Sequence, residues 1–343
     1  MSAAHVHFVG TIGLDSTIEV FDTAGKMLGE HLLRCPDGET GGRRQWVMWQ
    51  YPFLRSSPYL TLASTGALAG AGVVPMSLAP GIKAADIKFG ELGYCREARL
   101  SYQDFLDAKR RGTLPAHVRF QVCLPAPYEV AGAFLTPEAL AAAGPAYERA
   151  MLRDLACICA AIPHHDLAIQ WDICFEMLMW DGGFPMMPRF DGIEQAYAGR
   201  FARISGAVPR DVQLGFHLCY GDNDAKHFVD PHDLSKAVEL ANLIIDHAGR
   251  PVDWIHMPVP ADRKDPEYYA PLRNLKQTGG RPEVFLGLVH AQDGVAGTRA
   301  RMAVARRFLA DFGIATECGM ARVRTPEQVM ELLRVHAGAA DTD

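Results

Sequence analysis

A histidine and two cysteines have the types and spacing that zinc could use. His217 and Cys219 are two positions apart in an apolar run, so on a strand both side chains point to the same face. Cys318 lies much later in the chain, near the end of another apolar run. Imidazole nitrogen and thiolate sulfur are ligands that suit zinc better than magnesium or calcium. If the ends of these two strands meet, we expect His217, Cys219 and Cys318 to bind zinc.

The competing interpretation of these residues is packing. A His-x-Cys pair on a strand is commonly part of a core, and a single cysteine such as Cys318 behaves as a small hydrophobe. Their place at the ends of separate strands favours the metal site. Cys157 and Cys159 are different, because residues two apart on an apolar helix diverge, and we expect both to pack in the core.

Groups that could move protons also follow predicted strands. Asp172 ends one strand, His256 lies in another, and His290 and Asp293 end a third. Asp222 ends the strand that carries the His-x-Cys pair. Histidine titrates near neutral pH, and a carboxyl group can act as a general acid or base. We therefore expect Asp172, His256, His290 and Asp293 to be catalytic.

Aromatic and charged residues form a candidate substrate site. The segment 174–187 combines methionine and aromatic residues with glycine and proline. Such a segment could be the wall or lid over a flat apolar ligand, and a core helix or a dimer interface is the competing interpretation. For Glu39 and Arg43, a surface salt-bridge network is an equal alternative. We expect the substrate to be bound by Glu39, Arg43, Trp46, Gln170, Phe175 and Trp180.

The elements that must position these residues alternate between strand and helix. We predict strands at 5–13, 118–127, 165–173, 212–222, 252–259, 283–294 and 313–320, and helices at 146–162, 234–249, 297–313 and 325–337. Repeated strand–helix units imply a parallel sheet, in either a closed barrel or an open doubly wound form. No GxGxxG follows the first strand, and polar residues end many strands, which favours the barrel. We predict an α/β fold, a single TIM (β/α)8 barrel over 1–338, with a frayed tail at 339–343.

Several short motifs resemble those of one enzyme superfamily. The segment 215–221, Gly-Phe-His-Leu-Cys-Tyr-Gly, resembles the zinc motif of cobalamin-independent methionine synthases. The segment 316–322, Thr-Glu-Cys-Gly-Met-Ala-Arg, resembles the motif on the last strand of that family. Segments 286–289, 169–172 and 34–39, the last followed by Arg43, resemble further family segments in the same order. We identify the chain as a divergent member of the uroporphyrinogen decarboxylase and methionine synthase (UROD/MetE-like) superfamily, which implies a TIM barrel and zinc.

The departures from the family pattern bear on the substrate. The resemblance aligns Pro258 with a glutamate that completes the zinc site in methionine synthases, and His256, two residues earlier, could replace it as fourth ligand. The family's aspartate-glutamate step becomes Asp172-Ile173, which loses an acid that would bind an amino-acid substrate. The aspartate that usually follows Leu-Gly-Leu-Val becomes His290. Homocysteine is therefore not the expected substrate.

Two enzyme functions follow, and a third reading is a non-catalytic relative that keeps only the barrel. The first is a zinc-dependent transferase of a one-carbon or alkyl unit, acting on a small aromatic or flat substrate. The second is a lyase, either a decarboxylase or a formaldehyde-releasing C–C lyase, that acts on an aromatic substrate by acid–base catalysis with or without zinc. Numerous polar strand ends favour an enzyme over the non-catalytic relative.

Composition excludes several other classes of function. The 343 residues are 49% hydrophobic and 22% charged, with a net charge of −6, so no basic field is present to hold nucleic acid. We find no apolar run of the ~18 residues that a membrane span needs, and no signal-peptide pattern at the start. We expect a cytoplasmic protein with reduced cysteines, a small-molecule substrate, and no membrane or nucleic-acid partner. A homodimer is left open.

Overall fold

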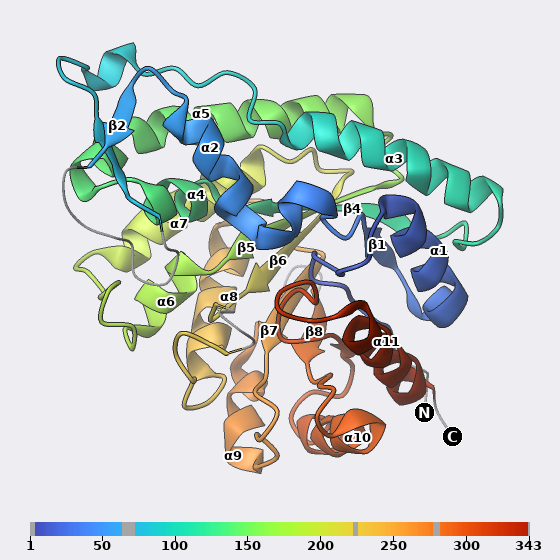
Figure 1. The fold of residues 1–343 in the computed structure, drawn as a ribbon. Coiled ribbons are helices and arrows are strands. Elements are labelled where there is room, and N and C mark those ends of the chain that lie inside the picture. The colour runs from blue at the N-terminus through green and yellow to red at the C-terminus, as the bar shows by residue number, and fades with distance from the viewer. Residues whose placement is uncertain (1–3, 64–72, 222–225, 277–281, 342–343) are drawn as a thin grey trace.

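A curved sheet of parallel strands forms the centre of the computed structural model, which describes residues 4–63, 73–221, 226–276 and 282–341 (Figure 1). Seven strands pair in the order β1-β4-β5-β6-β7-β8-β9. Their bounds are β1 Arg34–Pro36, β4 Arg119–Pro125, β5 Leu167–Ile173, β6 Gln213–Leu218, β7 Trp254–Pro258, β8 Glu283–Gly287 and β9 Gly313–Ile314. A separate antiparallel pair, β2 Leu60–Leu62 and β3 Met76–Leu78, lies outside this sheet.

The segment around Val6 closes the sheet into a barrel. Val6 forms parallel bridges with Leu32, just before β1, and with Ile314 of β9. The Val6 amide donates to the His31 carbonyl at 2.8 Å, and the His7 amide donates to the Ile314 carbonyl at 2.9 Å. With the seven strands of the sheet, this segment gives the eight-stranded closed arrangement of the predicted TIM barrel, and the fold prediction is confirmed.

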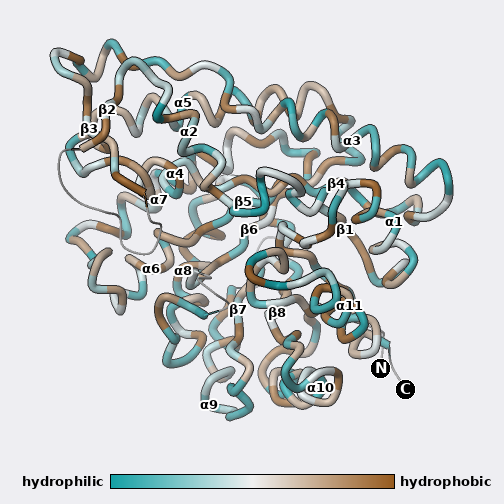
Figure 2. The backbone as a smooth tube through the Cα atoms, in the orientation of Figure 1, coloured by the Kyte–Doolittle hydropathy of each residue, from teal (hydrophilic) through white to brown (hydrophobic). Residues whose placement is uncertain are grey.

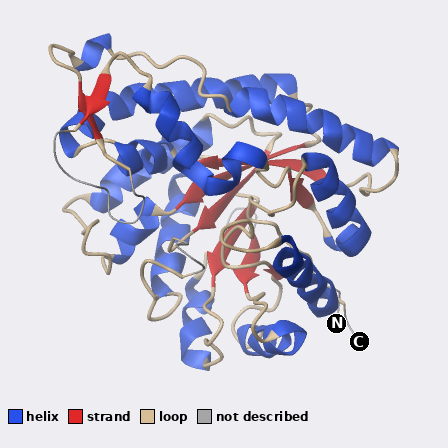
Figure 3. Cartoon of the chain, in the orientation of Figure 1, coloured by secondary structure: helices blue, strands red, loops and turns tan. Residues whose placement is uncertain are grey.

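Helices cover the outside of the barrel (Figure 3). The longer helices are α1 Thr17–Leu28, α3 Tyr94–Arg110, α5 Pro137–Ala161, α7 Ile193–Gly206, α8 Ser235–His247, α10 Gly294–Ala305 and α11 Pro326–Ala340. The shorter helices are α2 Gln50–Arg55, α4 Pro127–Phe134, α6 Phe175–Asp181 and α9 Pro266–Tyr269. The outer helices alternate between hydrophilic and hydrophobic residues, as α3 does in Figure 2, because one face packs on the strands.

Most predicted elements coincide with observed ones, and the exceptions have local causes. Strand β1 was missed because it has only three residues, too few for a visible period. The predicted helix at 297–313 stops at Ala305 in α10, and Gly313 already belongs to β9. The predicted frayed tail at 339–343 is wrong at its start, since α11 continues to Ala340 and buries Ala339 and Ala340.

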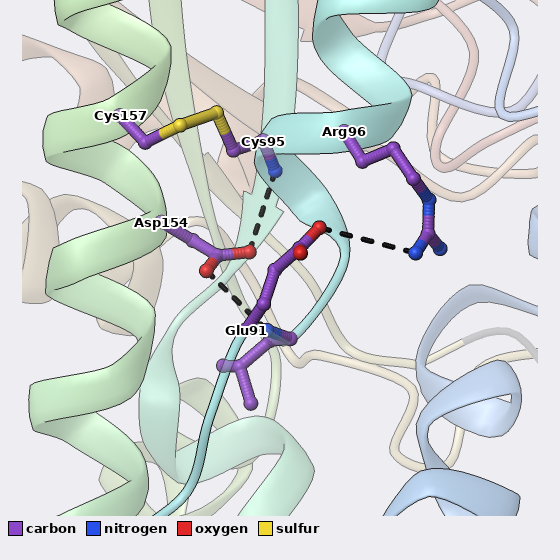
Figure 4. The surroundings of a disulfide bond; sticks show 6 residues. Glu91, Cys95, Arg96, Asp154 and Cys157 are labelled. Atoms are coloured by element: carbon purple, nitrogen blue, oxygen red, sulfur yellow. Dashed lines mark hydrogen bonds and ion pairs between the residues drawn. A yellow bond between two sulfur atoms is a disulfide. The ribbon is translucent and has the colours of Figure 1, made fainter.

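A disulfide corrects the expectation that the cysteines stay reduced. Cys95 of α3 is bonded to Cys157 of α5, with their Cα atoms 5.9 Å apart (Figure 4). The Asp154 carboxylate, one turn before Cys157, accepts a hydrogen bond from the Cys95 amide at 3.3 Å. Cys157 therefore joins two helices instead of packing as a core hydrophobe, whereas Cys159 is buried as predicted.

Polar side chains fill the barrel interior below the ends of the strands. The Nε2 atom of His7 lies 2.9 Å from Oε1 of Gln170, and Gln121 donates to the Phe8 carbonyl at 2.8 Å. The guanidinium of Arg34 lies 4.3 Å from the centroid of the Trp254 ring and forms an ion pair with Glu283. These contacts fill the interior between the strands, below their carboxyl ends.

Candidate functional site

A cavity of about 320 Å³ opens at the carboxyl ends of the strands. In a TIM barrel this end carries the active site, because the loops that follow all eight strands meet there. The loops after the Val6 segment, β1, β5, β6 and β9 all contribute to its lining. The lining includes polar and thiol side chains, namely those of Thr11, Glu39, Gln45, Asp172, Cys174, His217, Cys219, Cys318 and Arg322.

Three of the lining residues form a candidate metal site. One ligand atom from each of His217, Cys219 and Cys318 lies within 4.8 Å of the other two. The sulfur atoms of Cys219 and Cys318 are 3.7 Å apart. Because His217 and Cys219 come from the end of β6 and Cys318 follows β9, the fold brings together the residues that the sequence placed at separate strand ends.

The protonation of His217 prepares it for a metal. His256 Nε2 lies 3.0 Å from the Thr316 carbonyl oxygen, which can only accept a hydrogen bond, so this nitrogen carries the proton. Burial lowers the pKa of His256 to about 3, which keeps the ring neutral and leaves its Nδ1 as an acceptor. That Nδ1 lies 2.7 Å from Nδ1 of His217, which must therefore be the donor.

The Nε2 atom of His217, a residue that lines the cavity, is therefore left without a proton. Burial, followed by the neighbouring His256, holds the pKa of His217 well below its ordinary value, so its Nε2 has a free lone pair. This buried atom has no hydrogen-bond partner among the described residues. Metal-binding histidines characteristically donate their other ring N–H to a supporting group, as His217 does. A neutral imidazole and two adjacent thiols fit the ligand set of zinc.

His256 occupies a different place from the fourth-ligand position suggested by the sequence. Both of its ring nitrogens are engaged, one by His217 and the other by Thr316. Neither nitrogen is available to a metal or to a substrate. Its role in this geometry is to fix the tautomer and the orientation of His217.

Two carboxyl groups face the same cavity. Asp172 accepts hydrogen bonds from Gln170 at 2.9 Å and from the Trp46 indole at 3.2 Å. Burial raises the pKa of Asp172 to about 7. Burial, and then the charge of Asp172, raises the pKa of Glu39 to about 8. At neutral pH Glu39 is therefore protonated and can donate a proton to a group in the cavity.

Backbone strain coincides with this part of the cavity. Glu39 has a φ of 47° and Trp46 a φ of 51°, a region that non-glycine residues rarely adopt. Such conformations persist only where the surrounding structure enforces them, and they concentrate at functional sites. The strain orients a carboxyl group and an indole toward the cavity.

Apolar side chains form much of the remaining lining. Trp46 meets Phe175 edge-to-face with ring centroids 6.4 Å apart, and Phe184 stacks on Phe228 at 5.5 Å. Met186 and Met187 complete this wall, which belongs largely to the predicted segment 174–187. A cavity with an aromatic and methionine wall and a few polar groups suits a flat, mostly apolar ligand.

Two of the predicted catalytic residues lie away from the cavity lining. His290 Nε2 donates to the Val259 carbonyl at 2.9 Å, and its Nδ1 lies 3.5 Å from Glu317. Asp293 forms ion pairs with Arg301 at 2.7 Å and with Lys264 at 2.9 Å, and the Arg301 hydrogen bond holds its pKa well below the usual range. The loop after β8 thus directs these two side chains into hydrogen bonds and ion pairs with neighbouring residues, away from the cavity. The predicted Asp222 lies outside the described residues.

The predicted substrate-binding residues divide into two groups. Glu39, Trp46 and Phe175 line the cavity, whereas three others do not. Arg43 is bonded to Asp37 at 2.7 Å and lies 3.7 Å from Glu97. Gln170 is fully buried beneath Asp172, and Trp180 packs between Arg189 and Tyr197.

Arg322 and Cys174 are among the lining residues that the sequence did not indicate. Arg322 lies with its guanidinium 5.6 Å from the centroid of the Trp46 ring, and its charge lowers the pKa of both Asp172 and Glu39. Cys174 directly follows β5, and only its membership of an apolar segment drew notice. The signal for Cys174 was its spacing from Asp172, since residues two apart on a strand share a face.

Comparison with known proteins gives a likeness of fold. No family model matches the chain, and no curated protein matches it. A B12-independent methionine synthase from Shewanella sp. W3-18-1, solved in complex with selenomethionine, superposes with a TM-score of 0.64 and 13% identity, covering 97% of this chain and 96% of that one. A putative vitamin-B12-independent methionine synthase from Listeria monocytogenes superposes with a TM-score of 0.56 and 14% identity, covering 99% and 98%. At these identities the likeness establishes a shared barrel along nearly the whole chain.

The helices were also tested for membrane spans. Within the described ranges, none combines the length and the apolar character that crossing a bilayer requires.

We predict that Glu39 makes the protein less stable as pH rises. A carboxyl whose pKa is higher in the folded than in the unfolded protein stabilises the fold at low pH, and this contribution is lost as pH rises from the unfolded value toward about 8. The facing groups are Asp172 and Asp37, which raise this pKa, and Arg43 and Arg322, which lower it. Glu39→Gln should flatten the decline in unfolding free energy between pH 5 and 8, by at most ~1.4 kcal/mol per pH unit.

The measurement is urea denaturation of chelator-treated protein at several pH values. Glu138→Gln is the matched control, because Glu138 is exposed at the start of α5 and should leave the pH slope of the wild type unchanged. An identical slope in wild type and Glu39→Gln would show that Glu39 ionises normally in the fold.

We predict that His256→Leu weakens zinc binding without removing a ligand. Loss of the His256 acceptor leaves the Nδ1–H of His217 buried and unpaired, which favours the wrong tautomer. Removal of such supporting partners typically costs 10–100-fold in metal affinity. Titration against a chromogenic chelator measures this affinity, and His256→Gln, whose amide oxygen can accept from His217, should recover part of the loss. Equal affinity for wild type and His256→Leu would remove His256 from the metal site.

Proposed function

We propose that this chain is a divergent member of the UROD/MetE-like superfamily and transfers a methyl or short alkyl group in a zinc-dependent reaction. The observation that carries the proposal is the convergence of a His217 ring nitrogen with the thiols of Cys219 and Cys318 beside the cavity. The shared barrel with B12-independent methionine synthases supports it. The motifs of 215–221 and 316–322 support it further.

The donor set defines what the metal would contribute. His217, Cys219 and Cys318 would hold the zinc ion, and all three line the cavity in which a substrate would lie. When bound, zinc would lower the pKa of a thiol or hydroxyl that coordinates it and so supply a nucleophile at neutral pH.

The carboxyl groups would handle the proton of the transfer. When the alkyl carbon bonds to the acceptor, the bond to the donor atom breaks, and that atom keeps the electron pair and needs a proton. Glu39, protonated at neutral pH, is placed at the cavity to give that proton. Asp172 is held in place by Gln170 and Trp46, and its charge would stabilise the proton on Glu39 before transfer.

The wall of the cavity favours a small aromatic or otherwise flat substrate over homocysteine. Trp46, Phe175 and Phe184 offer ring surfaces, and Met186 and Met187 can adapt to the shape of a ligand. Ile173, where the superfamily resemblance places an acid, is fully buried and offers no polar group to an amino-acid substrate.

A lyase is the second candidate, and the Glu39–Asp172 pair is the observation that favours it. Two carboxyls with raised pKa values in one cavity could supply an acid and a base without a metal. The histidines first considered for this role do not line the cavity or have both nitrogens engaged, so the acid–base work would fall to the carboxyls.

Thermal shift of the zinc-loaded protein tests the substrate class. Aromatic acids, phenols and aromatic thiols should raise the melting temperature, since a ligand at 100 times its Kd stabilises by about 2.7 kcal/mol. Trp46→Ala should abolish the shift, and Phe190→Ala, an exposed aromatic outside the cavity lining, should keep it. Stabilisation by homocysteine or methyl-folate, with none from any aromatic compound, would contradict the proposed substrate.

Chelation then separates the two reactions. The transferase should lose turnover when zinc is removed and regain it when zinc is restored. Release of carbon dioxide or formaldehyde from an aromatic substrate by chelator-treated protein would overturn the transferase in favour of the lyase.

A further inference from the structure

We propose that Cys174 is the fourth protein ligand of the zinc site. This inference rests on the proposed zinc binding by His217, Cys219 and Cys318 and adds a ligand that the sequence motifs do not indicate. The zinc site would then have one imidazole and three thiolate ligands, a common set for four-coordinate zinc.

The register between β5 and β6 places Cys174 beside Cys219. Asp172 pairs with His217, and Ile173 pairs with Leu218. The pairing continues one step further, because the Cys219 amide donates to the Ile173 carbonyl at 2.9 Å. Cys174 is therefore the lateral neighbour of Cys219, on strands that lie ~4.8 Å apart.

The alternation of side chains directs both cysteines to the same side. Asp172 and His217 point to the cavity, and residues two positions later on each strand share that face. Cys174 and Cys219 both line the cavity, together with Cys318. The three thiols, which follow β5, β6 and β9, thus lie at one cavity, and the Cys174 sulfur would have to turn toward the group of ligand atoms formed by His217, Cys219 and Cys318.

Burial fits a shared cation. Cys174 is 2% exposed and Cys219 is 6% exposed, so neither thiol is satisfied by bulk water. Buried thiols at neighbouring strand ends are groups that a bound divalent cation would convert to thiolates.

A buried carboxyl holds the backbone that carries Cys174. Glu129, fully buried in α4, accepts hydrogen bonds from the Cys174 amide at 2.6 Å and the Phe175 amide at 2.9 Å. These bonds fix the Cα–Cβ direction of Cys174, so rotation about a single bond is enough to aim its sulfur. A ligand on a fixed backbone keeps its place without ordering a loop.

The other candidates for the fourth position are engaged elsewhere. His256 uses both ring nitrogens, and Asp172 accepts from Gln170 and Trp46. Glu317, next to Cys318 in sequence, lies 3.3 Å from His227 and 3.5 Å from His290. Of these residues and Cys174, only Cys174 combines a soft ligand atom with a place beside Cys219 in the register of the sheet.

Four protein ligands change how a substrate would enter the site. The incoming atom would displace Cys174 or add as a fifth ligand, as catalytic zinc sites allow. Because Cys174 begins the segment 174–187, which also supplies Phe175, Phe184 and the cavity methionines, release of its sulfur would be coupled to the wall that contacts the substrate.

Cobalt substitution and zinc titration test the assignment on the full-length protein. Cys174→Ser and Cys174→Ala should lower zinc affinity, measured against a chromogenic chelator, by at least about 10-fold. The thiolate-to-cobalt absorption per bound Co²⁺ should fall by about a third, since two thiolates remain of three. Cys159→Ser, which alters a buried cysteine of α5, should retain wild-type affinity and absorption.

X-ray absorption of wild-type zinc protein gives the sulfur count without any variant, and three sulfurs are expected. Two sulfurs, or wild-type affinity and absorption in both Cys174 variants, would overturn the Cys174 assignment and leave the proposed zinc site standing. A wild-type protein that binds no zinc would overturn the proposed function and this inference together.

Discussion

The hydrogen bond between the Nδ1 atoms of His217 and His256 determines what the mouth of this barrel can do. Because the Thr316 carbonyl fixes the proton on His256 Nε2, the His256 ring accepts from His217, and the free lone pair of His217 faces the cavity. Burial keeps both rings neutral, so the arrangement does not depend on pH near neutrality. A single backbone oxygen in the loop after β9 thus sets the tautomer of a side chain on β6.

The barrel contains two different environments, a hydrogen-bonded polar interior and a cavity with buried carboxyl groups at the carboxyl ends of the strands. Below the strand ends, His7 pairs with Gln170, and Arg34 packs on Trp254 and pairs with Glu283. Above them, burial raises the pKa values of Glu39 and Asp172. The imidazole and thiol groups and the carboxyl proton donor therefore lie in the same cavity but follow different strands. In the proposed reaction, a nucleophile and a leaving group could be contacted from two sides.

The sequence predicts which residues converge when their positions depend on strand period and strand order. It does not predict the direction in which a loop turns its side chains. His217, Cys219 and Cys318 were recognisable because residues at the ends of parallel strands must converge. His290 and Asp293 follow the same rule, yet the loop after β8 turns them toward Val259 and Arg301, and no pattern in the sequence encodes that turn. The Cys95–Cys157 disulfide, between residues 62 positions apart on two helices, likewise depends on how α3 packs against α5.

Anomalous scattering would show whether a metal lies between His217 Nε2 and the thiols of Cys219 and Cys318. Crystals of protein purified without added metal should show, above the zinc absorption edge, one strong peak at the mouth of the barrel. It should lie ~2.0–2.1 Å from His217 Nε2 and ~2.3 Å from the Cys219 and Cys318 sulfurs, and it should vanish below the edge. A zinc-loaded crystal with no peak at these three residues, or with His217 Nε2 bonded to a water or a protein donor instead, would contradict the account.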